Sequence, residues 1–167
     1  SKLSLMIKVM IIDDEKHCIT TLLHLLKAYK DEVAIVATTQ HSSDAKSLIE
    51  EHQPNLIFLD IEMPIMNGLE LLQRSSSLPF ETIFTTAYDQ YAIKALRLSA
   101  LDYLLKPIDK QELKAAIDKY KSKELITTNE QLQQVKKITQ HKIMDTLALS
   151  TIEGLMFIKI KDIMYLE

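Results

Sequence analysis

Five short apolar runs alternate with segments of helical periodicity over roughly the first 120 residues of this chain. The runs span residues 7–12, 33–37, 56–59, 82–85 and 101–105. Because their apolar residues are nearly continuous, each run is typical of a strand buried on both faces. Between them, apolar residues recur every three or four positions, which predicts helices at residues 19–26, 45–52, 69–72, 91–98 and from Asp109 onward. Five β/α units predict a doubly wound α/β fold with a parallel sheet.

Polar side chains interrupt these runs at their carboxyl ends. Asp13 and Asp14 follow the first run, and Asp60 follows the third. Thr86 and Lys106 follow the fourth and fifth runs. In a sheet of order 2-1-3-4-5, ligands bind where the strand order reverses, between strands one and three. We therefore expect the three acids to meet at this edge of the sheet.

Such an acidic cluster predicts a bound cation. At ~5 Å and an effective dielectric constant near 20, each carboxylate pair repels by ~3 kcal/mol. Oxygen ligands in an open crevice favour Mg²⁺, and Ca²⁺ fits less well because no loop carries many carboxylates. A carboxylate beside Mg²⁺ can attack a phosphoryl group, whose oxygens Lys106 and the Thr86 hydroxyl can hold. Taken singly, each of these residues is also typical of an ordinary turn, helix cap or packing position. The prediction of a phosphoryl-accepting site therefore depends on their joint placement at the carboxyl ends of the strands.

Four motifs around these residues resemble the receiver domain of two-component response regulators. They are Ile11-Ile-Asp-Asp-Glu15, Asp60-Ile-Glu-Met-Pro64 with Asn67-Gly68, Thr85-Thr-Ala87, and Asp102-Tyr-Leu-Leu-Lys-Pro107. The resemblance covers about residues 7–121, and our domain boundaries are 6–122. It implies a flavodoxin-like fold and a regulatory phosphoacceptor that catalyses only its own phosphotransfer and dephosphorylation.

The resemblance also implies roles for the acidic residues. Asp60 would accept a phosphoryl group from a sensor histidine kinase. Asp14 would ligate Mg²⁺ directly, whereas Asp13 would act mainly through water. The backbone carbonyl of Glu62 would be the third protein ligand of the metal.

By the same resemblance, four further residues would bind the phosphoryl group or respond to it, and Pro107 would have a structural role. Thr86, with Ala87 beside it, would bind a phosphoryl oxygen, and Lys106 would pair with the phosphate. Tyr103 would be an aromatic switch that turns inward as Thr86 moves. The bond to Pro107 would be cis and would shape the loop that aims Lys106.

The pattern changes after the fifth unit. We expect residues 123–145 to form a linker or an extended helix, and residues 146–167 to form short strands at 146–152, 155–160 and 163–166. With residues 84–96, this tail resembles regulators of the LytR/AlgR class, whose LytTR-type DNA-binding domain would begin here and be incomplete. The complete protein would bind DNA, but this chain would not, since its tail offers only Lys159 and Lys161 as basic residues.

The resemblance further implies that phosphorylation promotes a homodimer through the fourth helix, fifth strand and fifth helix. We also favour pairing of the tail between copies over packing against its own receiver. The single cysteine, Cys18, lies on an apolar helical face and is expected to be a buried structural residue. No apolar run approaches the ~20 residues of a membrane helix, and no signal peptide is visible, so we expect a cytoplasmic protein without a membrane partner.

Three alternatives remain open. A haloacid-dehalogenase-type phosphatase would carry an Asp-x-Asp nucleophile on its first strand, where this chain has adjacent acids. A flavodoxin-like cofactor domain needs a phosphate loop rich in Ser, Thr or Gly, whereas Asp13-Asp14-Glu15 would repel phosphate unless a metal intervened. A pseudo-receiver, an interaction module that is never phosphorylated, would not need the full set of acids, Thr86 and Lys106.

Overall fold

The computed structural model describes residues 6–64, 66–68, 70–71, 79–89 and 100–151. Its sheet contains the strands β1 (Ile7–Ile12), β2 (Val33–Thr39), β3 (Leu56–Asp60), β4 (Glu81–Thr86) and β5 (Asp102–Leu105). The strands pair in parallel in the order β2-β1-β3-β4-β5, which confirms the predicted doubly wound fold. The switch in strand order therefore lies between β1 and β3.

Successive residues of the central strands enter two different hydrophobic clusters. In β1, Val9 and Ile11 belong to one cluster, and Met10 and Ile12 belong to the other. β3 alternates in the same way, because neighbouring side chains of a strand point to opposite faces of the sheet. This two-sided burial explains why the runs in the sequence are continuously apolar.

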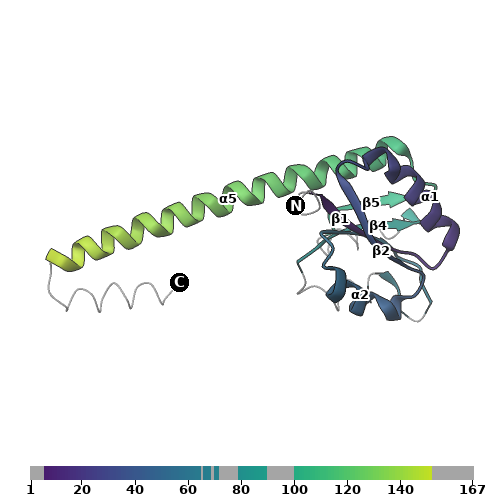
Figure 1. Cartoon of the computed structure of the whole chain (residues 1–167), viewed down its shortest axis with the longest axis horizontal. Coiled ribbons are helices and arrows are strands. Elements are labelled where there is room, and N and C mark those ends of the chain that lie inside the picture. Colours follow the sequence, from purple (N-terminus) through teal and green to yellow (C-terminus); the bar gives the residue numbers. More distant parts are fainter. Residues whose placement is uncertain (1–5, 65, 69, 72–78, 90–99, 152–167) are drawn as a thin grey trace. The chain divides into compact units, whose positions relative to one another are not determined.

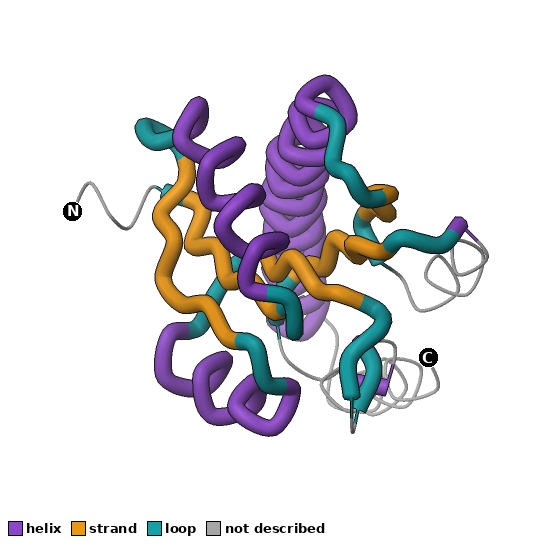
Figure 2. Tube along the Cα trace, turned by 90° about the vertical axis from the view of Figure 1, so that its right-hand side faces the viewer, coloured by secondary structure: helices purple, strands orange, loops and turns teal. Residues whose placement is uncertain are grey.

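Helices cover both faces of the sheet. The described helical segments are α1 (Lys16–Leu26), η2 (Lys27–Tyr29), η3 (Ser42–Asp44), α2 (Ala45–His52) and α5 (Lys110–Thr151). The buried residues of α1 and of the first turns of α5 join one cluster, and those of α2 join the other. Figures 1 and 2 show α1 and α2 on opposite sides of the strands.

Local sequence signals account for the helix ends. The Asp109 carboxylate accepts hydrogen bonds from the backbone N–H groups of Gln111 and Glu112 at 2.8 and 3.1 Å, which caps the start of α5. At the end of α2, Gln53 adopts a left-handed conformation with φ of 45°, and Pro54 follows it. The predicted helix at residues 91–98 lies outside the described residues, and only parts of the helix predicted at 69–72 are described.

The chain divides into two compact units, Ser1–Tyr120 and Lys121–Glu167. In the second unit, residues 123–145 are helical, so they take the extended-helix alternative. The strand predicted from Thr146 is wrong as far as Thr151, because α5 continues to that residue. A helix forms its backbone hydrogen bonds within itself, and Leu and Ala have high helix propensity. A strand instead needs a neighbouring strand to pair its backbone N–H and C=O groups. The later predicted strands, and with them the tail pairing, lie outside the described residues.

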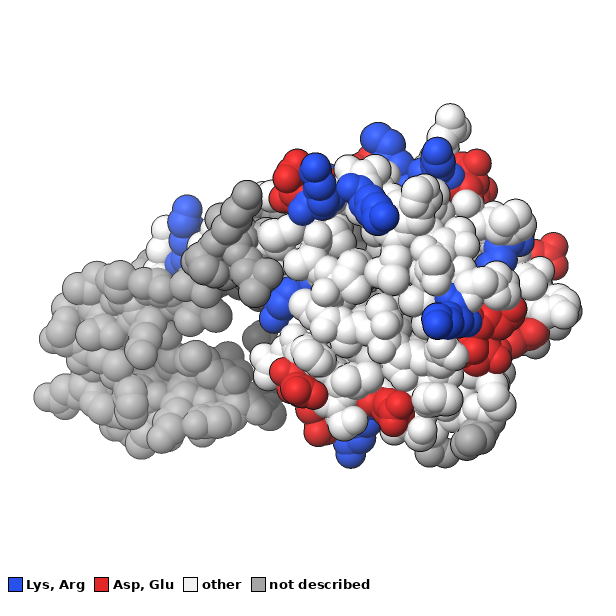
Figure 3. Space-filling view, turned by 45° about the vertical axis from the view of Figure 1, so that its right-hand side comes forward, with Lys and Arg blue, Asp and Glu red and all other residues white. Residues whose placement is uncertain are grey.

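A helix that is long and apolar enough to cross a membrane is not found in the described part of the chain. On the face of the molecule drawn in Figure 3, basic and acidic side chains are interspersed and do not gather into one patch.

Candidate acidic site at the carboxyl edge of the sheet

The carboxylates of Asp13, Asp14 and Asp60 meet, as the sequence predicts. Pairing of β1 with β3 places Ile12 opposite Leu59, so the residues that follow each of them are neighbours. One oxygen from each acid lies within 4.8 Å of the others. Asp13 and Asp60 are both buried, with 3% of their surfaces exposed.

Lys106 joins two of these acids. Its Nζ lies 2.8 Å from Asp13 Oδ2 and 3.5 Å from Asp60 Oδ1. Burial lowers the pKa of Lys106, but the hydrogen bond to Asp13 and the charges of Asp60 and Asp13 outweigh burial and raise it above its usual value. Lys106 therefore stays protonated, and one cation faces three carboxyl groups.

The local charge is suited to a further cation. Oδ1 of Asp14 is buried and has no hydrogen-bond partner, although a buried carboxylate oxygen normally has one. Burial and the neighbouring Asp13 raise the pKa of Asp60 to about 8, because a second negative charge in this space is unfavourable. A hard divalent cation would satisfy the unpartnered oxygen and remove this repulsion, so the residues fit Mg²⁺.

Backbone hydrogen bonds fix the position of the Asp60 side chain. The N–H of Ile61 donates to the Thr85 carbonyl at 3.1 Å, and the N–H of Glu62 donates to Asp60 Oδ1 at 3.3 Å. The Glu62 side chain points into solvent, and coordination by its carbonyl stays a prediction. Gly68 closes the loop, since its N–H donates to the Ile61 carbonyl at 2.8 Å.

Gly68 packs directly against the backbone of Asp60. A Cβ added to it would lie 2.2 Å from the carbonyl oxygen and 2.9 Å from the carbonyl carbon of Asp60. Only glycine fits here, because backbone atoms cannot move aside as the end of a flexible side chain can. The Asn67-Gly68 motif thus has a steric role that the sequence alone did not define.

We expect Gly68→Ala to destabilise the chain by roughly 1–3 kcal/mol, the usual cost of overpacking. The displaced Asp60 should also weaken binding of Mg²⁺. Urea denaturation, followed by circular dichroism with and without Mg²⁺, measures both effects. Lys46→Ala, at an exposed position of α2, is the control and should leave the midpoint nearly unchanged. An unaltered midpoint for Gly68→Ala would contradict the steric argument.

The residues predicted to sense the phosphoryl group surround this cluster. Thr86 is fully buried, and its Oγ1 accepts a hydrogen bond from the Tyr88 N–H at 3.2 Å. The N–H of Lys106 donates to the Thr86 carbonyl at 2.7 Å, which ties the ends of β4 and β5 together. The Tyr103 hydroxyl donates to the carbonyl of Tyr88, so Tyr103 and Thr86 contact the same residue.

Ala87 and Pro107 also lie at this edge of the sheet. Ala87 is exposed and lines the same cavity as Asp13 and Lys106. The Lys106–Pro107 peptide bond is cis, as the resemblance predicted.

Cys18 also lines this cavity, which has a volume of about 370 Å³, although the sequence pattern did not indicate it. Cys18 is half-buried, so the prediction of a buried structural residue is wrong. Its place in the first turn of α1, directly after the acidic motif, turns it toward the carboxyl edge of the sheet. Glu15 and His17 line the same cavity.

Comparison with known proteins agrees with this architecture. Residues 9–118 match the family model described as response regulator receiver domain. The chain therefore belongs to the response regulator receiver family of two-component systems, which is a family of regulatory domains.

Among its relatives, the sensory transduction protein LytT of Bacillus subtilis strain 168 is 35% identical over 164 residues, covering 96% of this chain and 64% of that protein. The transcriptional regulatory protein BtsR of Salmonella typhi is 39% identical over 114 residues, covering 67% of this chain and 47% of that protein. The solved REC domain of AraT, a response regulator from Geobacillus stearothermophilus, gives a TM-score of 0.64 at 33% identity, covering 72% of this chain and 97% of that one. The chain spans just under two thirds of the length of its LytT relatives.

Proposed function

We propose that Asp60 accepts a phosphoryl group from a phosphorylated histidine of a sensor kinase. The observation that supports this most directly is the buried Asp60 carboxylate, held beside Lys106 at the switch point of the sheet. In the transfer, a carboxylate oxygen of Asp60 forms a bond to phosphorus while the bond from phosphorus to the donor nitrogen breaks. The electron pair of that bond returns to the histidine ring, and Asp60 becomes an acyl phosphate.

The acidic cluster would hold Mg²⁺ for this reaction. When bound, the metal supplies charge neutralisation for the oxygens of the transferred group. Asp14, with its unpartnered oxygen, and Asp60 are the direct ligands that we propose, together with the Glu62 carbonyl. Asp13 is already paired with Lys106 at 2.8 Å, which favours an indirect role through water.

The chain's own residues would then hold the phosphoryl oxygens. Lys106 can exchange its contact with Asp60 for one with the phosphate, since its Nζ lies 3.5 Å from Asp60 Oδ1. Thr86 would turn its hydroxyl toward the phosphate and release the Tyr88 N–H, which frees Tyr103 to move inward. This sequence of contacts links the acceptor to the β4 and β5 edge of the sheet.

For the complete protein we propose a DNA-binding output domain that phosphorylation controls. This rests on the likeness to LytT and BtsR, whose names describe sensory transduction and transcriptional regulation. Incubation with a small acyl phosphate, with Mg²⁺ or with a chelator, tests the core of the proposal. Acid-labile label that depends on Mg²⁺ supports a phosphoacceptor. A chain that takes up no label with Mg²⁺ present would instead be the pseudo-receiver.

A phosphoryl mimic should promote dimerisation of this chain. Tyr103 lies in β5, the central element of the expected dimer face, and Thr86 pairs with Leu105 of the same strand. Moving a switch from mostly off to mostly on requires about 5.5 kcal/mol of differential interaction, to which new contacts of Lys106 and Thr86 would contribute. Sedimentation velocity with beryllofluoride and Mg²⁺ should show a shift from monomer toward dimer.

Asp60→Asn is the control for this experiment, because it removes the carboxylate to which beryllofluoride binds. The variant should sediment alike with and without the mimic. An unchanged monomer of the wild-type chain at high concentration would contradict the proposed coupling. It would leave phosphorylation of Asp60 as a separate question, which the labelling experiment answers.

A further inference from the structure

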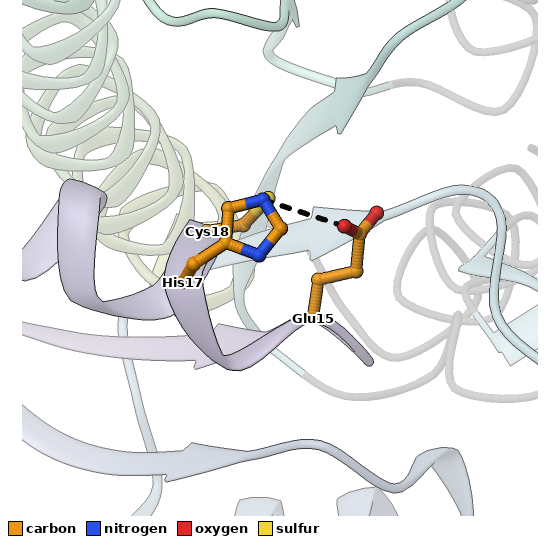
Figure 4. Close-up of side chains that lie close together, drawn as sticks. All are labelled: Glu15, His17 and Cys18. Atoms are coloured by element: carbon orange, nitrogen blue, oxygen red, sulfur yellow. Dashed lines mark hydrogen bonds and ion pairs between the residues drawn. The ribbon is translucent and has the colours of Figure 1, made fainter.

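Three chemically different metal-binding side chains converge at the start of α1. The Nε2 atom of His17 lies 3.5 Å from Cys18 Sγ and 3.4 Å from Glu15 Oε2. All three donor atoms lie within 4.8 Å of one another, and Figure 4 shows the imidazole nitrogen between the sulfur and the carboxylate. Adjacent residues of a helix do not normally face each other, so the approach of His17 to Cys18 reflects a specific side-chain arrangement.

These distances match the edges of a tetrahedral zinc site. With Zn–N of 2.0–2.1 Å, Zn–S near 2.3 Å and Zn–O near 2.1 Å, tetrahedral angles place N and S ~3.6 Å apart and N and O ~3.4 Å apart. The observed separations from His17 Nε2 are 3.5 Å to sulfur and 3.4 Å to oxygen. The third pair of donors, Cys18 Sγ and a Glu15 oxygen, lies within 4.8 Å, and rotation of the exposed Glu15 side chain can shorten this distance.

The surroundings provide a rigid frame and space for a fourth ligand. The Glu15 carbonyl accepts hydrogen bonds from the N–H groups of Cys18 and Ile19 at 3.0 and 3.3 Å, and the Glu15 N–H donates to Asp13 Oδ1 at 2.9 Å. The cavity of about 370 Å³ that these residues line can hold water beside the three donors. His17 and Glu15 are 77% and 54% exposed, so an ion reaches them without opening the fold.

The donor set distinguishes this location from the acidic site. Thiolate and imidazole select borderline or soft ions such as Zn²⁺, whereas the carboxylates of Asp13, Asp14 and Asp60 suit hard Mg²⁺. When Cys18 loses its proton to solvent, the thiolate and the Glu15 carboxylate together offer a charge of −2, which a divalent cation neutralises. The nearby Lys106 is already paired with Asp13, at 2.8 Å.

We propose that Glu15, His17 and Cys18 form a second metal site, specific for Zn²⁺ and similar ions, with water as the fourth ligand. The site is separate from the one that holds Mg²⁺ and does not depend on phosphorylation. Binding breaks the S–H bond of Cys18 and forms a metal–sulfur bond, and the proton passes to solvent without any change of oxidation state.

Calorimetric titration of the 167-residue chain with Zn²⁺, in excess Mg²⁺ to saturate the acidic site, tests the proposal. We expect one zinc per chain. His17→Ala and Cys18→Ser should each weaken binding by at least the roughly 10–100-fold that loss of an outer-shell partner costs. His24→Ala, at an exposed histidine on the same helix, is the matched control and should bind as the wild type does. Asp60→Asn alters the acidic site and tests whether zinc binds there instead.

Cobalt provides an independent spectroscopic readout. Co²⁺ should produce a thiolate-to-metal charge-transfer band, and Cys18 is its only source because the chain has one cysteine. Absence of this band, or zinc affinity that is unchanged in both His17→Ala and Cys18→Ser, would overturn the proposal. A ratio of one zinc to two chains, or loss of binding in Asp60→Asn alone, would also overturn it.

Discussion

Asp60→Asn should take up no acid-labile label from a small acyl phosphate in the presence of Mg²⁺. The amide has no nucleophilic carboxylate oxygen, yet it is nearly isosteric and can still accept the hydrogen bond from the Glu62 N–H. The variant should therefore fold but lack the nucleophile. Phosphate-affinity electrophoresis, read before and after acid treatment, measures the label.

Asp31→Asn is the matched control, since Asp31 is exposed and far in sequence from the proposed acceptor. It should be labelled as strongly as the wild type. Asp13→Asn and Asp14→Asn should slow labelling without removing the acceptor, so longer incubation should recover part of it. Equal label on Asp60→Asn and wild type would contradict the assignment and place the phosphoryl group on another residue.

Mg²⁺ should stabilise this chain strongly against unfolding. A ligand that binds only the folded state at 100 times its dissociation constant adds about 2.7 kcal/mol. For a protein of this size, that corresponds to an increase of roughly 5–10 °C in the melting temperature. Thermal denaturation with a Mg²⁺ titration measures the effect, and Asp14→Asn should lose most of it because Asp14 carries the unpartnered oxygen.

Without metal, the free energy of unfolding of this chain should fall as the pH rises. The pKa of Asp60 is raised from 3.8 to about 8, so the folded chain binds its proton more tightly than the unfolded chain does. The stabilising contribution of the protonated group is complete below pH ~4 and is lost as the pH rises toward the folded-state pKa. We expect the metal-free chain to lose stability across that range, and Asp60→Asn to lose less.

Saturating Mg²⁺ should cancel this loss, because the metal stabilises the ionised carboxylates. Melting temperatures between pH 5 and pH 8, with Mg²⁺ and with a chelator, separate the two conditions. If the metal-free wild type and Asp60→Asn showed the same pH profile, burial of Asp60 would not control stability in this range.

The sequence predicted the sheet and its acidic site well because both depend on strong, regular signals. The run Ile7–Ile12 is apolar at nearly every position, and only a strand covered on both faces requires that. The prediction that Asp13, Asp60 and Lys106 meet is confirmed because they lie at, or directly after, the carboxyl ends of strands whose order the fold determines.

Other features depend on contacts that a linear pattern does not encode. The closeness of Gly68 to the Asp60 carbonyl arises where a loop returns to the sheet, and nothing in the composition of that loop measures the distance. The apolar character of its helix predicted that Cys18 is buried, although its place in the first turn of α1 puts it beside the cavity. The strand expected at Thr146 failed because residues with apolar alternation also continue a helix that has already begun.

The sheet separates the interior into two compartments that share strands but few side chains. Phe58 packs on the side of α1, while Phe84 packs on the side of α2. A substitution that changes the volume of a side chain in one compartment therefore alters the packing of its neighbours in that compartment. The backbone of the sheet lies between it and the side chains of the other compartment. Substitutions in the two compartments should therefore change the free energy of unfolding nearly additively, because the two clusters of buried side chains have no members in common.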